Sequence, residues 1–92
     1  MFEFDANKSA QNKEKHGIDF LEAQELWQDQ SRVVFPSNNT EEPRYVMISR
    51  LHGTCWSAIF TYRQNKIRII SVRRSRENEK AIYFSNSIGR GI

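Results

Sequence analysis

The side chains best suited to chemistry form a basic cluster in the last third of the chain. Residues 63–92 hold eight cations against two acids, a net charge of +6, whereas residues 1–31 carry −4. A charge distribution divided in this way attracts polyanions to the C-terminal third and repels them from the N-terminal third. The sequence therefore predicts a polyanion site near the C-terminus. The alternative is that these cations only solvate the surfaces of a strand and a helix.

The spacing of this cluster predicts that it gathers where a strand passes into a helix. Arg68 is expected to project from the strand, and Arg73 and Arg74 follow the end of that strand. Glu79 and Tyr83 are an i, i+4 pair on one face of the following helix. Backbone N–H groups at a helix start also favour a phosphate. Together these groups indicate a phosphodiester site that works without a metal ion.

RNA cleavage at such a site needs a base for the 2′-OH proton, cations for the charged phosphorane and an acid for the leaving 5′-oxygen. Arginines supply the charge, and Tyr83, Glu79, Lys8 or His16 are candidates for proton transfer. Further cations are predicted to bind RNA around the site: Arg63, Lys66, Arg76 and Lys80. Two alternatives remain open, since Tyr83 also fits a core position and His16 also fits a residue that stabilises a helix end.

The sequence offers few residues that could bind a metal ion or a cofactor. His16 and His52 are the only histidines, Cys55 is the only cysteine, and no phosphate-binding glycine loop is present. We expect no metal, no cofactor and no internal disulfide, and this cysteine usage is typical of a reducing cytoplasm. Neither a secretion leader nor a membrane span is predicted, so no membrane partner is expected.

Two helices are predicted near the N-terminus. Asp5 caps a helix that ends at Gly17, whose missing Cβ permits the left-handed conformation. Asp19 and Glu22 form a variant of the capping box and begin a second, amphipathic helix. Its apolar face consists of Phe20, Ala23, Leu26 and Trp27.

The rest of the chain predicts a small sheet and a last helix. β-prone runs at residues 32–35, 44–50, 55–63 and 67–72 are separated by turn signals, and a helix is expected from residue 76 to about residue 84. The predicted fold is α+β, with two N-terminal helices packed on a three- to four-stranded antiparallel sheet, followed by a C-terminal helix.

The length of 92 residues is that of a single domain with one core. We expect one domain over residues 1–92, of which residues 85–92, with two glycines and no periodicity, form a flexible tail.

Two motifs in this order resemble the BrnT family of bacterial type II toxins, over about residues 2–84. The first is Phe2-Glu3-Phe4-Asp5 with Lys8, Asn12 and Lys15-His16-Gly17, followed by Ile18-Asp19-Phe20 and Glu22-Ala23; the second is the run 67–74 with Glu79 and Tyr83. The resemblance implies a RelE-like ribonuclease fold and RNA cleavage that arrests translation and growth. It also implies a cognate BrnA-type antitoxin of the ribbon-helix-helix class, through which the complex binds operator DNA.

The family's functional residues carry over to matching positions only. These are Lys8, Lys15, His16, Gly17, Arg68, Ser71, Arg73, Arg74, Glu79 and Tyr83. The chain departs from the family pattern at Phe4, where Trp is common, and at Ser75-Arg76, where a small residue and Thr are usual. Two other functions remain open: an RNA- or ribosome-binding module without catalysis, and an assembly partner whose basic face is covered by an acidic antitoxin segment.

Overall fold

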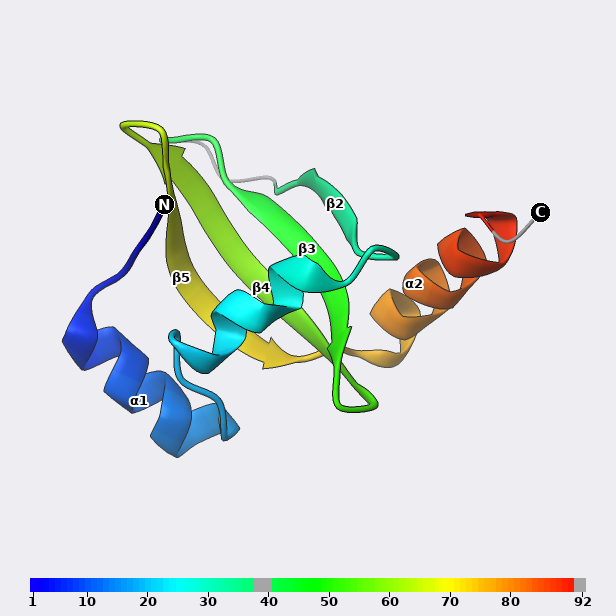
Figure 1. Ribbon diagram of the computed structural model, residues 1–92, viewed down its shortest axis with the longest axis horizontal. Coiled ribbons are helices and arrows are strands. Elements are labelled where there is room, and N and C mark those ends of the chain that lie inside the picture. The colour runs from blue at the N-terminus through cyan, green and yellow to red at the C-terminus, as the bar shows by residue number, and fades with distance from the viewer. Residues whose placement is uncertain (38–40, 91–92) are drawn as a thin grey trace.

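The computed structural model describes residues 1–37 and 41–90, and side chains up to residue 86 (Figure 1). The described elements are β1 (Phe2–Glu3), α1 (Ala6–His16), the 3₁₀-helix η1 (Glu22–Gln28), β2 (Val33–Pro36), β3 (Tyr45–Leu51), β4 (Thr54–Arg63), β5 (Lys66–Arg74) and α2 (Glu77–Arg90). The strands form one five-stranded sheet in the order β1-β5-β4-β3-β2. None of the described helices is both long and apolar enough to cross a membrane.

The predicted antiparallel sheet of three to four strands is wrong, because β1 adds a parallel fifth strand. Strands β2 to β5 form an antiparallel meander, and β1 pairs parallel with β5 through Phe2 opposite Ile67 and Glu3 opposite Arg68. The sheet is therefore mixed. Two residues carry too little pattern to predict a strand, and the partner lies more than sixty positions away. The pairing is held by burial, since the Phe2 ring packs edge-on against Trp27 with centroids 5.0 Å apart.

The second predicted helix is also corrected, because η1 is a 3₁₀-helix and α1 is the only N-terminal α-helix of the described chain. Phe20, Ala23 and Leu26 are three positions apart and all are almost fully buried. A 3₁₀-helix has three residues per turn, so it aligns these three side chains better than an α-helix does. The predicted capping box is confirmed. The Glu22 N–H donates to Asp19 Oδ1 at 2.7 Å, and the Asp19 N–H donates to Glu22 Oε1 at 2.9 Å.

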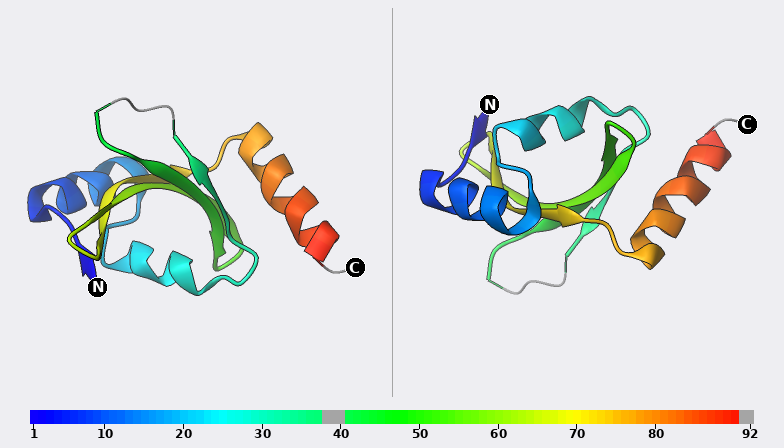
Figure 2. Two further views of the ribbon diagram at one scale, coloured as in Figure 1. Left: turned by 90° about the horizontal axis from the view of Figure 1, so that it is seen from above. Right: turned by 90° about the horizontal axis from the view of Figure 1, so that it is seen from below.

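The two N-terminal helices do not cover the same face of the sheet, contrary to the prediction. Figure 2 shows η1 within the concave side of the curved sheet, α1 beside β5, and α2 on the outer side. The main core lies between η1 and the sheet and contains residues such as Leu26, Met47 and Phe60. A second, smaller core under α2 contains Ile48, Cys55 and Tyr83.

Helix α1 is fixed to the edge of β5 by one side chain. Strand β1 ends at Glu3, so the edge of β5 beyond Arg68 has no strand partner among the described residues. Asn12 replaces that partner: its Oδ1 accepts from the Val72 N–H at 3.2 Å, and its Nδ2 donates to the Val72 carbonyl at 2.9 Å. The predicted caps of this helix are confirmed, with Asp5 accepting two backbone N–H bonds and Gly17 at φ 84°.

A β-bulge in β5 determines which side chains share a face. Ile59 pairs with Ser71 and Phe60 with Ile69, so Ile70 is an extra residue without a partner on β4. Ile67, Ile69 and Val72 consequently lie on the concave side, where they contribute to the main core. The side chains on the outer side are Arg68, Ser71 and Arg73.

Helix α2 extends further than the sequence indicates. It begins at Glu77 and continues to Arg90, past the predicted end near residue 84. The last residues of the predicted tail, 91–92, lie outside the described residues, as do residues 38–40 between the predicted strands 32–35 and 44–50. The side chain of Glu79 accepts a hydrogen bond from the Arg76 N–H at 2.7 Å, which caps the helix start.

Candidate functional site

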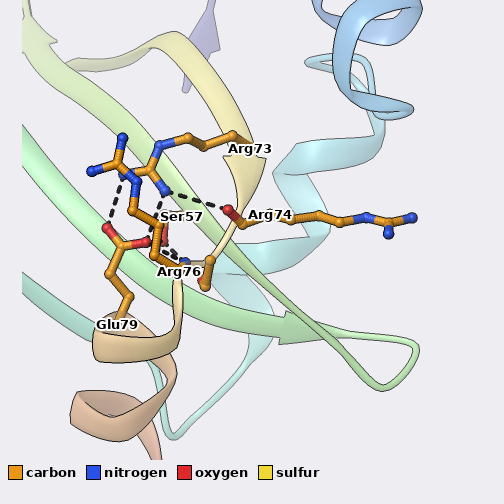
Figure 3. A network of polar contacts seen from close by, with 6 residues as sticks. Ser57, Arg73, Arg74, Arg76 and Glu79 are labelled. Carbon is orange, nitrogen blue, oxygen red and sulfur yellow. Dashed lines mark hydrogen bonds and ion pairs between the residues drawn. The ribbon is translucent and has the colours of Figure 1, made fainter.

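The predicted cluster does not gather at one point, because Arg73 and Arg74 face opposite sides of the sheet. Arg73 pairs with Ser57 on the outer side, and Arg74 pairs with Trp56 on the concave side. In Figure 3 the Arg74 side chain extends away from Arg73 and Glu79. The alternation of side chains along a strand makes this separation unavoidable for two adjacent residues.

Arg73 is neutralised by a carboxylate. Its guanidinium donates to both oxygens of Glu79, at 2.8 and 2.9 Å, and Glu79 also accepts from the Ser57 hydroxyl at 3.0 Å (Figure 3). The Arg73 guanidinium lowers the pKa of Glu79 to about 2, with help from the Arg76 N–H and the Ser57 hydroxyl. Glu79 therefore stays ionised near neutral pH and is poorly suited to proton transfer.

Tyr83 anchors α2 to the segment that follows η1. Its hydroxyl donates to Asp29 Oδ2 at 2.6 Å, and its side chain is almost fully buried in the second core. Burial, together with the neighbouring Asp29 carboxylate, raises the pKa of Tyr83 to about 12. This geometry matches the core alternative for Tyr83, and it makes the phenol a poor acid at neutral pH.

A groove between α1 and β5 brings together other predicted residues. It is a hollow of about 270 Å³ lined by Lys8, Gln11, Asn12, Lys15, His16, Ile70 and Ser71. The lining residues of α1 fall on one face because they are three or four positions apart. Lys8 and Lys15 are exposed, and neither has an ion-pair partner among residues 1–37 and 41–90.

Arg68 lies near one end of the groove. It is on the same side of β5 as Ser71, and its guanidinium is 3.3 Å from Glu3 Oε2. Its charge also helps to keep the pKa of Asp5 below the ordinary value, although the hydrogen bond from the Lys8 N–H to Asp5 is the larger cause. Both members of the Arg68–Glu3 pair are about a quarter exposed, so the pair is open to competition from water and ligands.

The groove has the groups needed to bind and cleave a phosphodiester. Two ammonium groups in the groove favour an anion, the half-buried His16 imidazole suits proton transfer, and Ser71 adds a hydroxyl; the Arg68 guanidinium lies outside the lining, beside the groove. Within the described part of the chain, no three His, Cys, Asp or Glu side chains gather at metal-ligand distances. Ser71 and Lys15 were absent from the site predicted from charge alone; the spacing of residues 8, 11, 12 and 15 on one helix face is the signal that locates Lys15.

The remaining predicted residues lie elsewhere. Arg63 and Lys66 flank the β4–β5 turn, where Arg63 is 3.5 Å from Glu42. Arg76 is exposed at the start of α2, and Lys80 is 3.1 Å from Glu77. Of the predicted site residues, only Lys8 and His16 line the groove; Arg68 lies beside it, and the others lie elsewhere.

Comparison with known proteins identifies the family. The family model described as the ribonuclease toxin BrnT of type II toxin–antitoxin systems matches residues 4–79. The match contains the whole α1–β5 groove, whereas Tyr83 lies beyond it. A search of curated proteins found no match. A ribonuclease toxin of this kind acts on RNA and is paired with an antitoxin. Because the match covers most of the 92 residues, this chain belongs to the BrnT family of type II ribonuclease toxins, as its resemblance indicated.

Proposed function

We propose that this chain is a metal-independent endoribonuclease whose active site is the α1–β5 groove, and that its cleavage of RNA in the cytoplasm inhibits translation and growth. One observation carries the proposal. Lys8 and Lys15, without ion-pair partners among the described residues, line the same hollow as the imidazole of His16 and the hydroxyl of Ser71. Unpaired cations are available to a phosphate, whereas Arg73 is already held by Glu79.

The reaction is an attack of the RNA's own 2′-oxygen on the neighbouring phosphorus. His16 accepts the 2′-OH proton as the new O2′–P bond forms, and the Lys8 ammonium donates a proton to the 5′-oxygen as the P–O5′ bond breaks. The products are a 2′,3′-cyclic phosphate and a free 5′-hydroxyl. Lys15 and Arg68 stabilise the additional negative charge on the phosphorane, which is the role that a metal ion has in other nucleases.

Arg73, Glu79 and Tyr83 act indirectly in this proposal. Glu79 fixes the Arg73 guanidinium at the end of β5, on the outer side that also carries Ser71. Tyr83 holds α2 through Asp29. Neither Glu79 nor Tyr83 transfers a proton, because their pKa values of about 2 and about 12 lie far from neutral pH.

The antitoxin of this chain is proposed to be a BrnA-type protein with a ribbon-helix-helix domain. It neutralises the toxin by covering the groove with an acidic segment that pairs with Lys8 and Lys15. Operator DNA is then bound through the antitoxin alone. Pull-down with the product of a neighbouring short reading frame tests this partner, and RNA cleavage must return when the toxin is freed.

The activity is tested by incubating the purified protein with total RNA in EDTA. The His16→Asn variant is expected to lose about a hundredfold or more in cleavage rate, as is typical for the loss of a proton-transfer group. The Lys8→Gln/Lys15→Gln variant is expected to lose a similar factor. Lys13→Gln is the matched control, since Lys13 is on the same helix but pairs with Glu22 at 2.8 Å.

Three results would contradict the proposal. Cleavage by folded His16→Asn at the wild-type rate would show that the groove is not the site. Loss of wild-type cleavage in EDTA and its recovery with Mg²⁺ would show that a metal is required. Binding of RNA with a steep salt dependence but without any cleavage would favour the RNA-binding module instead.

A further inference from the structure

A second basic hollow lies near Arg74 at the C-terminal end of β5, between the β3–β4 turn and α2. It has a volume of about 370 Å³ and is lined by Gly53, Thr54, Cys55, Arg74, Lys80 and Phe84. It shares no lining residue with the α1–β5 groove. Burial raises the pKa of the Cys55 thiol, so this cysteine is a packed wall of the hollow and not a nucleophile.

Arg74 is one of the residues that line this hollow, and its guanidinium stacks on Trp56 at the concave side of the sheet. Its guanidinium carbon is 5.8 Å from the centroid of the Trp56 ring, and it has no ion-pair partner among the described residues. Stacking on an aromatic face holds the guanidinium plane and leaves its N–H groups free at the edge. Arg74 therefore differs from its neighbour Arg73, whose N–H groups are used by Glu79.

Lys80 and Phe84 also line this hollow, and Arg50 contacts the Phe84 ring without lining the hollow itself. Among the residues that the structure describes, Lys80 forms an ion pair with Glu77 alone; the Glu77 side chain is 91% exposed, so a phosphate can readily replace that carboxylate. Arg50 lies 5.8 Å from the centroid of the Phe84 ring, and Phe84 is 43% exposed. Cations interleaved with partly exposed aromatic rings are typical of surfaces that bind single-stranded nucleic acid through its phosphates and base faces.

We propose that this hollow binds a nucleotide of single-stranded RNA that flanks the cleaved linkage, with Arg74 and Lys80 on its phosphate and Phe84 against its base. The inference rests on the proposed function of the groove. Ser71 and Arg74 are three residues apart on β5, a distance of roughly 10 Å along a strand. An RNA strand that leaves the groove past Ser71 thus reaches Arg74 by passing around the end of β5. An acidic protein segment is the competing occupant.

The test measures the affinity of the full-length protein for two 2′-O-methyl oligoribonucleotides, by fluorescence anisotropy. Methylation blocks the attacking oxygen, so binding is measured without cleavage. One oligonucleotide has three nucleotides and fits the groove alone, and the other has nine and reaches both sites. The variants are Arg74→Gln/Lys80→Gln and Arg63→Gln/Lys66→Gln, which removes the same charge at the opposite end of β4.

For the nine-nucleotide RNA, Arg74→Gln/Lys80→Gln is expected to raise Kd about tenfold or more. The slope of log affinity against log salt should fall by about 0.7 to 1.4, the loss of one or two phosphate contacts. Its affinity for the three-nucleotide RNA should stay within about twofold of wild type. Arg74→Lys keeps the charge and is expected to retain most of the affinity, which guards against an effect of folding alone.

Several results overturn the inference. An unchanged Kd for the long RNA does so, and so does an equal loss for both lengths or an equal loss in Arg63→Gln/Lys66→Gln. Loss of affinity for the antitoxin with full affinity for the long RNA would assign the hollow to an acidic segment. A wild-type protein that binds the long RNA but cleaves none contradicts the proposed function, while the binding comparison still decides this inference. A wild-type protein that binds neither RNA overturns both.

Discussion

The α1–β5 groove and the β5–α2 junction both contain basic side chains, but those in the groove lack an ion-pair partner among the described residues, whereas Arg73 at the junction is paired with a carboxylate. In the groove, neither Lys8 nor Lys15 has a carboxylate oxygen within 4 Å among the described residues, although the Lys8 charge helps to lower the pKa of Asp5. At the junction, Arg73 meets Glu79 through two hydrogen bonds of 2.8 and 2.9 Å. An unpaired cation creates an attractive potential for a ligand, whereas a bidentate pair fixes two elements relative to each other. The number of cations in a region thus says less about function than the partners of each one.

The largest effect on stability is expected for Glu79→Ala. It leaves Arg73, whose side chain is about 25% exposed, without its counter-charge, and it removes the cap on the Arg76 N–H. We expect the free energy of unfolding to fall by about 3 to 4 kcal/mol, measured by urea denaturation. Glu77→Ala is the matched control, because Glu77 pairs with Lys80 in solvent and its loss should cost less than about 0.5 kcal/mol. Similar losses for both variants would mean that the Arg73–Glu79 pair stabilises the fold no more than an ion pair at the surface does.

The pH dependence of the free energy of unfolding tests whether the Arg73–Glu79 pair stabilises the fold. The pKa of Glu79 falls from 4.5 to about 2 on folding, so the unfolded chain takes up this proton first as the pH falls. The resulting stabilisation, about 3 kcal/mol, is present above pH 4.5 and is lost between about pH 4.5 and pH 2. Wild type should therefore lose more stability than Glu79→Gln over this range. Parallel curves for the two proteins would show that the Arg73–Glu79 pair is not formed in solution.

Tyr83→Phe tests whether Tyr83 belongs with the structural residues. The change removes the hydrogen bond to Asp29, which keeps its bonds from the Ser31 and Arg50 N–H groups. We expect a loss of about 2 kcal/mol in the free energy of unfolding, as is usual for a hydrogen bond to a charged group. The folded variant should still cleave RNA at the wild-type rate. A cleavage rate that falls tenfold or more without loss of stability would place Tyr83 in the chemistry instead.

The smallest effect on stability is expected in the groove itself. Lys8→Gln/Lys15→Gln removes two exposed cations without a partner, so the free energy of unfolding should change by less than about 0.5 kcal/mol. The same variant should lose about a hundredfold in cleavage rate. A large loss of stability without a loss of activity would reverse the comparison between the two regions.

Local features of the fold could be predicted from the sequence because their partners are close along the chain. Asp5, Gly17 and the Asp19–Glu22 box form contacts within a few residues, and all three are found as predicted. The pairing of β1 with β5 depends on contacts between the two ends of the chain. The 3₁₀ form of η1 depends on packing against the sheet, which local propensity does not describe.

The candidate site was only partly predictable for a related reason. The net charge of residues 1–31 is −4, which hides the basic face of α1, because none of the acids of that region lines the groove. One of them, Glu22, pairs with Lys13 on another face of the helix. The spacing of Arg73 and Glu79 is compatible with a shared catalytic centre or with an ion pair, and the structure shows the ion pair. The family resemblance supplied what charge counting lacked, namely the positions of Lys15 and Ser71.

Because Ile70 is an extra residue in β5, this strand can lose one residue at that point without turning its later side chains to the other face. Losing one residue from a regular strand turns every following side chain over to the other face. Removing Ile70 would instead restore regular alternation between Ile69 and Ser71, so Val72 would stay in the core and Arg73 would still face Glu79. Natural variants of this toxin that differ by a deletion at this point are therefore expected to fold, with a straighter strand and one wall of the groove missing.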